Sequence, residues 1–229
     1  DVSYPRVPKW TSSIMNVRLL DIDNDGRLDL YAGYRNGTNS GTSGHVLGVN
    51  TGSGYFFDVT GQLPTPTSWT GLSPRETAVN DFNGDGFADL YLVGNGQNRL
   101  LFNRGAVAPG FFTDMTTSNV PNVSDESYGV LSGDLNGDRR ADLLMVGENC
   151  LYYLPQTADH TLGEPERLPY SGQVKSVQIL DINGDQREDL LLVNWDSANP
   201  LRFRLQNAAG QLGPEIHFQL PPVRSYWAD

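Results

Sequence analysis

One acidic segment occurs four times in this chain, and a short apolar run follows each copy. The copies read DIDNDGRLDLYAG from Asp21, DFNGDGFADLYLVG from Asp81, DLNGDRRADLLMVG from Asp134 and DINGDQREDLLLV from Asp181. Their starts are 60, 53 and 47 residues apart. Periods of this size are typical of repeat architectures, in which each unit buries its apolar face against its neighbours. The sequence therefore predicts a chain built from four similar units.

The acidic segments place like charges at a fixed spacing. Asp or Asn stands at positions 1, 3 and 5 and Asp at position 9, so these positions hold 13 of the 27 acidic residues of the chain. Carboxylates that close together repel one another, and we expect cations among them. A solvated acidic face is the alternative, but such a face does not repeat with fixed spacing. Four divalent cations would bring the formal net charge from -11 to about -3.

The spacing predicts calcium as the cation. Positions 1, 3 and 5 offer side-chain oxygens, position 7 a backbone carbonyl and position 9 a carboxylate, and an all-oxygen shell without His or Cys suits Ca²⁺. Mg²⁺ is less suited because it keeps its waters. We predict about four structural Ca²⁺ ions. The predicted ligands are Asp21, Asp23, Asp25, Arg27 and Asp29; Asp81, Asn83, Asp85, Phe87 and Asp89; Asp134, Asn136, Asp138, Arg140 and Asp142; Asp181, Asn183, Asp185, Arg187 and Asp189.

An EF-hand is the obvious competitor for such a loop. Its twelfth position carries a bidentate Glu, whereas these segments have Ala32, Leu92, Met145 and Leu192 there. Its flanks are helical, whereas the runs that follow these loops are short and apolar and end at Gly or Asn. The sequence therefore favours strands around each loop.

Each unit contains four strand-like runs: one before the acidic loop, one after it, a third such as RLLFN and a fourth such as YFFDVT. Short connections make them antiparallel, as in a propeller blade, and frequent Pro and Gly leave no convincing helix. The predicted fold class is all-β, a β-propeller of four-stranded antiparallel blades, with four blades in this chain. The predicted blades are approximately 10–67, 68–122, 123–170 and 171–222, with partial pieces at 1–9 and 223–229.

Both ends of the chain look like parts of further blades. DVSYPRVPKW resembles the end of a fourth strand, so Asp1 would match Asp58, and VRSYWAD resembles the entry into an acidic loop, so Asp229 would match Asp181. We expect the four blades to belong to a larger propeller of about seven blades. Neighbouring blades or self-association would then cover the open ends. A closed four-bladed ring is the alternative.

The four DxDxDGxxDL or DxNGDxxxDL segments resemble FG-GAP repeats, also described as VCBS repeats. These are the calcium-binding blades of integrin α-subunit propellers and of many bacterial and fungal surface proteins. The resemblance covers nearly the whole chain and implies fold and metal more than function. The last two loops depart from the family pattern at position 6. The family usually has Gly there, as Gly26 and Gly86 in loops 1 and 2, but loops 3 and 4 have Arg139 and Gln186. If this position needs a positive φ, the last two loops are strained and bind more weakly.

The resemblance implies an extracellular or cell-surface binding or adhesion scaffold, with a protein or glycan partner on the face opposite the calcium loops. Trp10, Trp69 and Tyr170 lie 11 or 12 residues before an acidic segment, and Trp195 lies on a second set of connections. Such aromatic side chains can stack on sugars or anchor a protein. Packing between blades is the alternative role. A lectin-like carbohydrate-binding propeller and a non-catalytic domain of a secreted enzyme are alternative functions.

Other classes of function fit the sequence less well. The net charge of -11 argues against nucleic acid as a partner, and no apolar run approaches the length of a membrane span. Cys150 has no partner for an internal disulfide and is expected to be a small buried side chain. His45, His160 and His217 fall in unrelated parts of different units, and no nucleophile elbow occurs. We therefore expect no catalytic activity.

Overall fold

The computed structural model of this chain describes residues 13–35, 43–64, 74–94, 96–121, 124–125, 127–147, 150–170, 174–194 and 199–218. Trp10, Trp69 and Trp195 lie outside these residues. Nowhere in the described ranges is a helix long and apolar enough to cross a bilayer.

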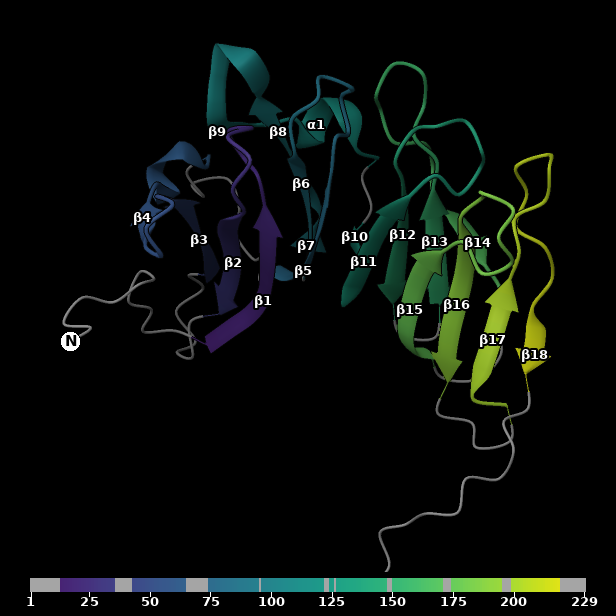
Figure 1. Ribbon diagram of the computed structural model, residues 1–229. Helices are drawn as coiled ribbons and strands as arrows, with labels where there is room; N and C mark the ends of the chain where they lie inside the picture. Colours follow the sequence, from purple (N-terminus) through teal and green to yellow (C-terminus); the bar gives the residue numbers. More distant parts are fainter. Residues whose placement is uncertain are drawn as a thin grey trace, which may run out of the picture.

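Four antiparallel sheets of four strands each make up most of the structure (Figure 1). Blade 1 contains β1 (Ser13–Leu20), β2 (Asp29–Arg35), β3 (Ser43–Asn50) and β4 (Phe56–Asp58). Blade 2 contains β5 (Pro74–Asn80), β6 (Asp89–Gly94), β8 (Arg99–Arg104) and β9 (Ala108–Asp114). Blade 3 contains β11 (Gly129–Gly133), β12 (Asp142–Gly147), β13 (Cys150–Leu154) and β14 (Glu166–Leu168). Blade 4 contains β15 (Val174–Leu180), β16 (Asp189–Asn194), β17 (Leu201–Arg204) and β18 (Ile216–Phe218).

Smaller elements fill the connections. They are the ribbon of β7 (Gly96–Gln97) with β10 (Ser124–Asp125), the 3-10 turns η1 (Thr60–Gln62) and η3 (Gly105–Val107), and the single-turn helix α1 (Thr116–Asn119). The expectation of no helix is therefore wrong for this one turn. It follows β9 directly, and the Asp114 carboxylate accepts a hydrogen bond from the Thr116 amide at 3.0 Å at its start. Cys150 is only half-buried at the start of β13, so the expected burial is incomplete.

Each acidic loop joins the first two strands of its blade in the same register. Residues 20 and 29 are paired, and so are 80 and 89, 133 and 142, and 180 and 189. The second strands β6 and β12 are buried at every residue because their blades lie between two others. This burial explains their continuous apolar sequences, since a strand covered on both faces needs no polar alternation.

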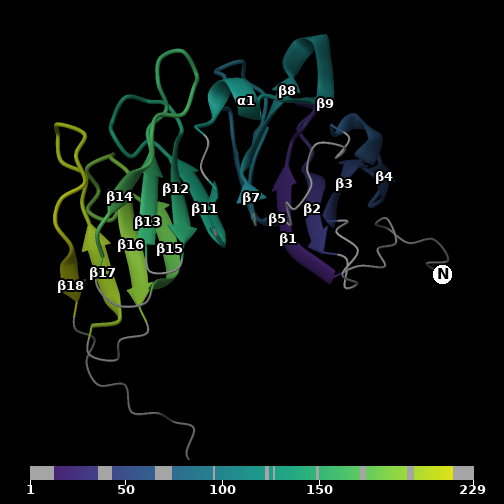
Figure 2. The same ribbon diagram turned by 180° about the vertical axis from the view of Figure 1, so that it is seen from behind.

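The core is divided among the boundaries between blades. Three apolar clusters each join two consecutive blades, and their fully buried members include Ile22, Tyr31 and Leu90, then Phe82, Tyr91 and Leu143, then Leu135, Leu144 and Leu190. The first strands contact one another in the order β1, β5, β11 and β15. A cavity of about 280 Å³ is lined by residues of all four of these strands, among them Arg18, Glu76, Leu131 and Ser176. The blades are therefore arranged around a common centre as in a β-propeller, with blades 1 and 4 at opposite ends of the arc (Figures 1 and 2).

Candidate metal centre in the acidic loops

The Asp at position 9 is the structural anchor of each loop. Asp29, Asp89, Asp142 and Asp189 have no exposed surface. Asp89 accepts the Phe82 amide of its own loop at 2.8 Å and the Asn103 amide of the third strand at 2.7 Å, and the other three make the equivalent pair of bonds. Position 9 therefore ties the start of the loop to the third strand of its own blade.

Burial works against the charge of these anchors. Loss of hydration raises the pKa of Asp89 to about 7 and that of Asp142 to about 6, while the backbone amides partly oppose the shift. Burial likewise raises the pKa of Asp29. A cation close to these carboxylates would favour their ionised forms.

The Asp at position 1 organises the turn. Asp81 accepts the amides of Gly84, Asp85 and Gly86 at 2.7 to 3.1 Å, and Asp21, Asp134 and Asp181 accept amides of the same turn in their own loops. These bonds, led by that from the Gln186 amide, lower the pKa of Asp181. In loop 4 the turn is therefore held by the ionised form of Asp181.

Position 6 has a left-handed backbone in all four loops. The φ angles are +84° at Gly26, +85° at Gly86, +66° at Arg139 and +67° at Gln186. The need for a positive φ at this position is therefore confirmed, and loops 3 and 4 place side chains where L-residues are strained.

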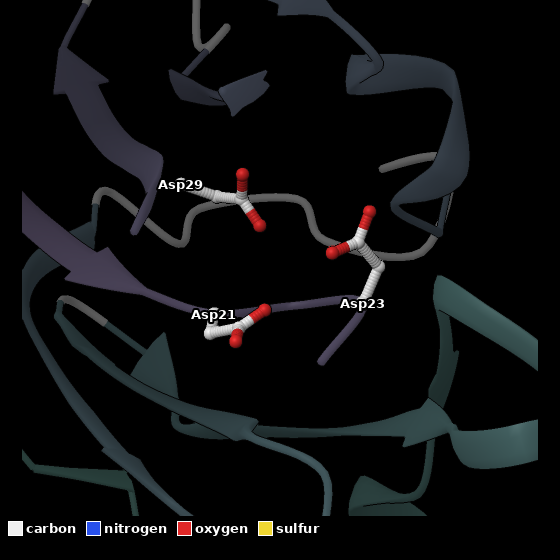
Figure 3. Close-up of side chains that lie close together, drawn as sticks. All are labelled: Asp21, Asp23 and Asp29. Carbon is white, nitrogen blue, oxygen red and sulfur yellow. The ribbon is translucent and has the colours of Figure 1, made fainter. Parts of the chain in front are cut away.

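Loop 1 brings three of its five predicted ligands together. Carboxylate oxygens of Asp21, Asp23 and Asp29 lie within 4.8 Å of one another and face a shared space between the end of β1 and the start of β2 (Figure 3). Burial first, and then the neighbouring Asp25 carboxylate, raise the pKa of Asp23. An all-carboxylate group of this kind fits a hard cation such as Ca²⁺.

The carboxylate at position 5 has a partner that the spacing alone does not show. The guanidinium at position 7 pairs with it in three loops, as Arg27 with Asp25, Arg140 with Asp138 and Arg187 with Asp185. The chain thus supplies part of the positive charge that the repeated carboxylates require. A metal would have to compete with this guanidinium in loops 1, 3 and 4.

Loop 2 differs because position 7 is Phe87. Its Asp85 accepts the Asn83 side-chain amide at 3.1 Å, and Asp185 in loop 4 accepts the Asn183 amide at 2.8 Å. An Asn at position 3 still offers its amide oxygen to a cation. Loop 2 therefore has Gly86 at position 6, and its position-5 carboxylate, Asp85, forms no ion pair with an Arg of the same loop.

A further set of residues ties loops 1, 2 and 3 to the following blade. An amide side chain lies at or near the end of every third strand. Three of these donate to carbonyls in the loop of the preceding blade: Asn103 to Ile22 at 2.8 Å, Gln156 to Phe82 at 2.6 Å and Gln206 to Asp134 at 2.9 Å. We call these bonds the amide latches. The recurrence of Asn or Gln at this point, as Asn50, Asn103, Gln156 and Gln206, was the signal available in the sequence.

Only one of the four aromatic candidates can be placed. Tyr170 packs against the apolar cluster between blades 3 and 4, and burial raises its pKa to about 12. This position agrees with the alternative role in packing between blades, and the ligand-binding role of Tyr170 stays a prediction. Trp10, Trp69 and Trp195 stay predictions outside the described residues.

A polar cavity lies beside the third loop. It measures about 480 Å³ and is lined by both blades 3 and 4, including Asn136, Arg139, Gln206 and Gly210. The corresponding turn of blade 3 carries His160, whose ring lies 3.1 Å from where a Cβ on Gly84 would be. In blade 4 the backbone of Gly210 lies directly against the equivalent loop, because a Cβ there would come within 1.7 Å of the Asn136 carbonyl oxygen.

Comparison with known proteins supports the fold. Residues 81–145 match the FG-GAP-like repeat family, so the predicted resemblance is confirmed for this segment. An Agrocybe aegerita lectin described as recognising non-reducing terminal N-acetylglucosamine shares 14% identity with a TM-score of 0.52 over 91% of this chain and 66% of its own. BBS1N in complex with ARL6DN shares 13% identity with a TM-score of 0.50 over 86% of this chain and 53% of its own. A search of curated proteins found no match.

This chain therefore spans less than two thirds of either solved chain. Identities this low show the fold alone.

Proposed function

We propose that this chain is a calcium-stabilised, non-catalytic binding scaffold that acts outside the cell. The observation that carries the proposal is the convergence of Asp21, Asp23 and Asp29 at the hairpin between β1 and β2. The hydrogen-bonded frame of this loop, with backbone amides held by positions 1 and 9, recurs in the other three blades. Within the described residues the three-carboxylate group itself occurs in loop 1, because position 3 is Asn in the other loops.

Calcium would act on the hairpin that each loop forms. The ion supplies charge neutralisation and oxygen coordination. The carboxylates at positions 1 and 9 already hold the turn and the third strand by hydrogen bonds, so a bound ion would add to an ordered frame. Weak sites suffice for this role, because extracellular modules bind calcium with dissociation constants of roughly 10⁻⁴ to 10⁻³ M.

Calorimetric titration of the chelator-treated protein tests the metal. We expect close to four sites. The loops with Gly26 and Gly86 should bind most tightly because their position 6 is unstrained, and loop 2 should be the tightest because Phe87 offers no competing charge. Fewer than two sites would contradict the proposal, and so would tightest binding in the Arg139 or Gln186 loop.

A single ligand variant locates the ion. Asp85→Ala should remove one calcium site and abolish most of the calcium-induced stabilisation of its blade, because it deletes a charged ligand. Glu164→Ala is the matched control, since Glu164 is exposed and outside the loops. Loss of calcium binding in both variants, or in neither, would argue against coordination by loop 2.

The partner is proposed to be a protein or a glycan. The solved chains with this fold include one described as a sugar-binding lectin and one captured with a protein partner. The cavity beside loop 3 supports the glycan alternative, because Asn136 and Gln206 line it with amide groups and Arg139 with a cation. A glycan array with the wild-type protein and with Arg139→Ala tests this. Equal glycan binding by the wild type and Arg139→Ala would exclude this cavity as the glycan site. If no glycan binds, a protein partner is favoured.

A further inference from the structure

The internal boundaries between blades use the same positions each time. We call the surface of a blade that packs on the preceding blade its leading face, and the opposite surface its trailing face. In blade 2 the leading face includes Val79, Leu90 and Leu92, and the trailing face includes Phe82 and Tyr91. All five belong to the apolar clusters that hold the arc together.

The leading face of blade 1 has the same apolar character without a described blade against it. Its exposed members are Val17, Leu19 and Leu28, whereas Leu30 and Ala32 on the same face are buried within the chain. Val17 is 43% exposed, whereas Thr77, Val130 and Val177, which occupy the same position in later blades, are at most 8% exposed. Leu19 and Leu28 are 57% and 55% exposed.

The trailing face of blade 4 is the opposite half of the same kind of boundary. Its members include Leu180, Ile182, Leu191, Phe203, Ile216 and Phe218. Leu180 is 37% exposed, whereas Leu20 at the same position of blade 1 is 3% exposed against blade 2. Ile216 and Phe218 are 47% and 50% exposed.

The amide latch is also divided between these two faces. Asn50 of blade 1 occupies the latch position and donates to the Leu28 carbonyl of its own loop at 3.1 Å, as Asn103 donates to the Ala88 carbonyl at 3.3 Å in addition to its latch. At the other end, no side chain in the described ranges donates to the Ile182 carbonyl, the position at which Ile22 and Phe82 accept a latch. One chain therefore carries the donor half and the acceptor half of the same boundary at opposite ends.

We propose that two copies of this chain associate head to tail, with the trailing face of blade 4 packed on the leading face of blade 1 of the second copy. The contact continues the pattern of the three internal boundaries, including a latch from Asn50 to Ile182. Such an interface is heterologous, because each copy contributes a different surface. Exposed apolar faces of this kind are typical of interaction sites. The proposal is independent of calcium and of any glycan or protein ligand.

Light scattering coupled to size exclusion tests the association, using the whole chain from about 1 to 100 µM, a range typical of moderate affinity. We expect a mass that rises above the 25.2 kDa of one chain. Leu19→Glu and Leu180→Glu should each weaken self-association about 100-fold or more, because each places an unpaired charge in the interface. Both positions are exposed within the chain, so circular dichroism should show an unchanged fold.

Mixing the two variants identifies the geometry. Leu19→Glu keeps an intact trailing face and Leu180→Glu keeps an intact leading face, so an equimolar mixture should recover one-to-one association that neither variant shows alone. If either variant still associates alone, the head-to-tail contact is overturned, because two identical faces would then bind each other. A mass of 25.2 kDa for the wild type at every concentration would also overturn the proposal.

Discussion

At position 6 of loop 2, a substitution changes stability through the backbone conformation and not through a steric contact. Gly86 has φ +85°, and a Cβ added there would meet no atom within 4 Å. Gly86→Ala should lower the free energy of unfolding by about 1 to 2 kcal/mol, because L-residues are disfavoured in this region. Urea denaturation measures the loss.

Gly61→Ala is the matched control for this substitution. Gly61 is exposed, its Cβ would also meet open space, and its φ lies outside the left-handed range. It should leave stability unchanged or raise it by up to about 1 kcal/mol, because alanine restricts the unfolded chain. Equal losses at the two positions would contradict a conformational cause.

A buried histidine makes stability depend on pH. His45 is 5% exposed, lies edge-on to Tyr31 with ring centroids 6.1 Å apart, and has a pKa that burial lowers to about 4. The unfolded chain, with a His pKa near 6.5, binds more protons between these two values. The stability associated with neutral His45 is therefore complete above about pH 6.5 and is lost as the pH falls toward 4.

His45→Gln should remove this dependence. The free energy of unfolding of the wild type minus that of the variant should fall by on the order of 3 kcal/mol between about pH 7 and pH 4. Urea denaturation across this range measures both proteins, and the carboxylates common to them cancel in the difference. A difference independent of pH would show that His45 is not buried as a neutral ring.

At the scale of strands and loops, the amide latches add hydrogen bonds between blades at the same boundaries as the apolar clusters. Gln156 is buried and donates to the Phe82 carbonyl across the boundary between blades 2 and 3. Gln156→Leu should lower the free energy of unfolding by about 1 to 3 kcal/mol, because it leaves a buried carbonyl without its donor. Asn50→Leu, at the same position of blade 1, should cost under about 1 kcal/mol because its bond stays within one exposed loop. Similar losses in thermal unfolding would mean that the latch does not act between blades.

The repeated pattern explains why the elements could be predicted. Four copies of one acidic segment between apolar runs place a loop between two strands in every unit, and a regular connection makes the strands antiparallel. The paired partners of Asp25 and Asp138 could not be predicted in the same way, because a position-7 Arg can point to solvent or back to its loop. The latch of Gln156 depends on how closely two blades approach, which no local pattern specifies. Helix α1 could not be predicted from the Asp114–Thr116 bond, because the same bond between Asp58 and Thr60 precedes a 3-10 turn in blade 1.

At the scale of the whole molecule, the charge is concentrated at one end of each blade. The four acidic loops contain 13 Asp residues at the predicted ligand positions, against a formal net charge of -11 for the chain. Three loops offset part of this charge with a guanidinium at position 7. Repulsion among the remaining carboxylates should therefore oppose folding in the absence of metal.

Salt should reveal this repulsion before any ligand is known. Raising the ionic strength from about 0.01 M to 0.15 M shortens the Debye length from about 30 Å to 8 Å, and so screens carboxylates in different loops from one another. The urea midpoint of the chelator-treated protein should rise over this range. With millimolar calcium present the same change of salt should have a smaller effect, because the bound ions already offset the charge that salt would screen. Magnesium at equal concentration is the control for simple ionic strength. A salt effect of the same size with and without calcium would mean that the loops bear their charge without bound metal, and that Arg27, Arg140 and Arg187 are their main counter-charges.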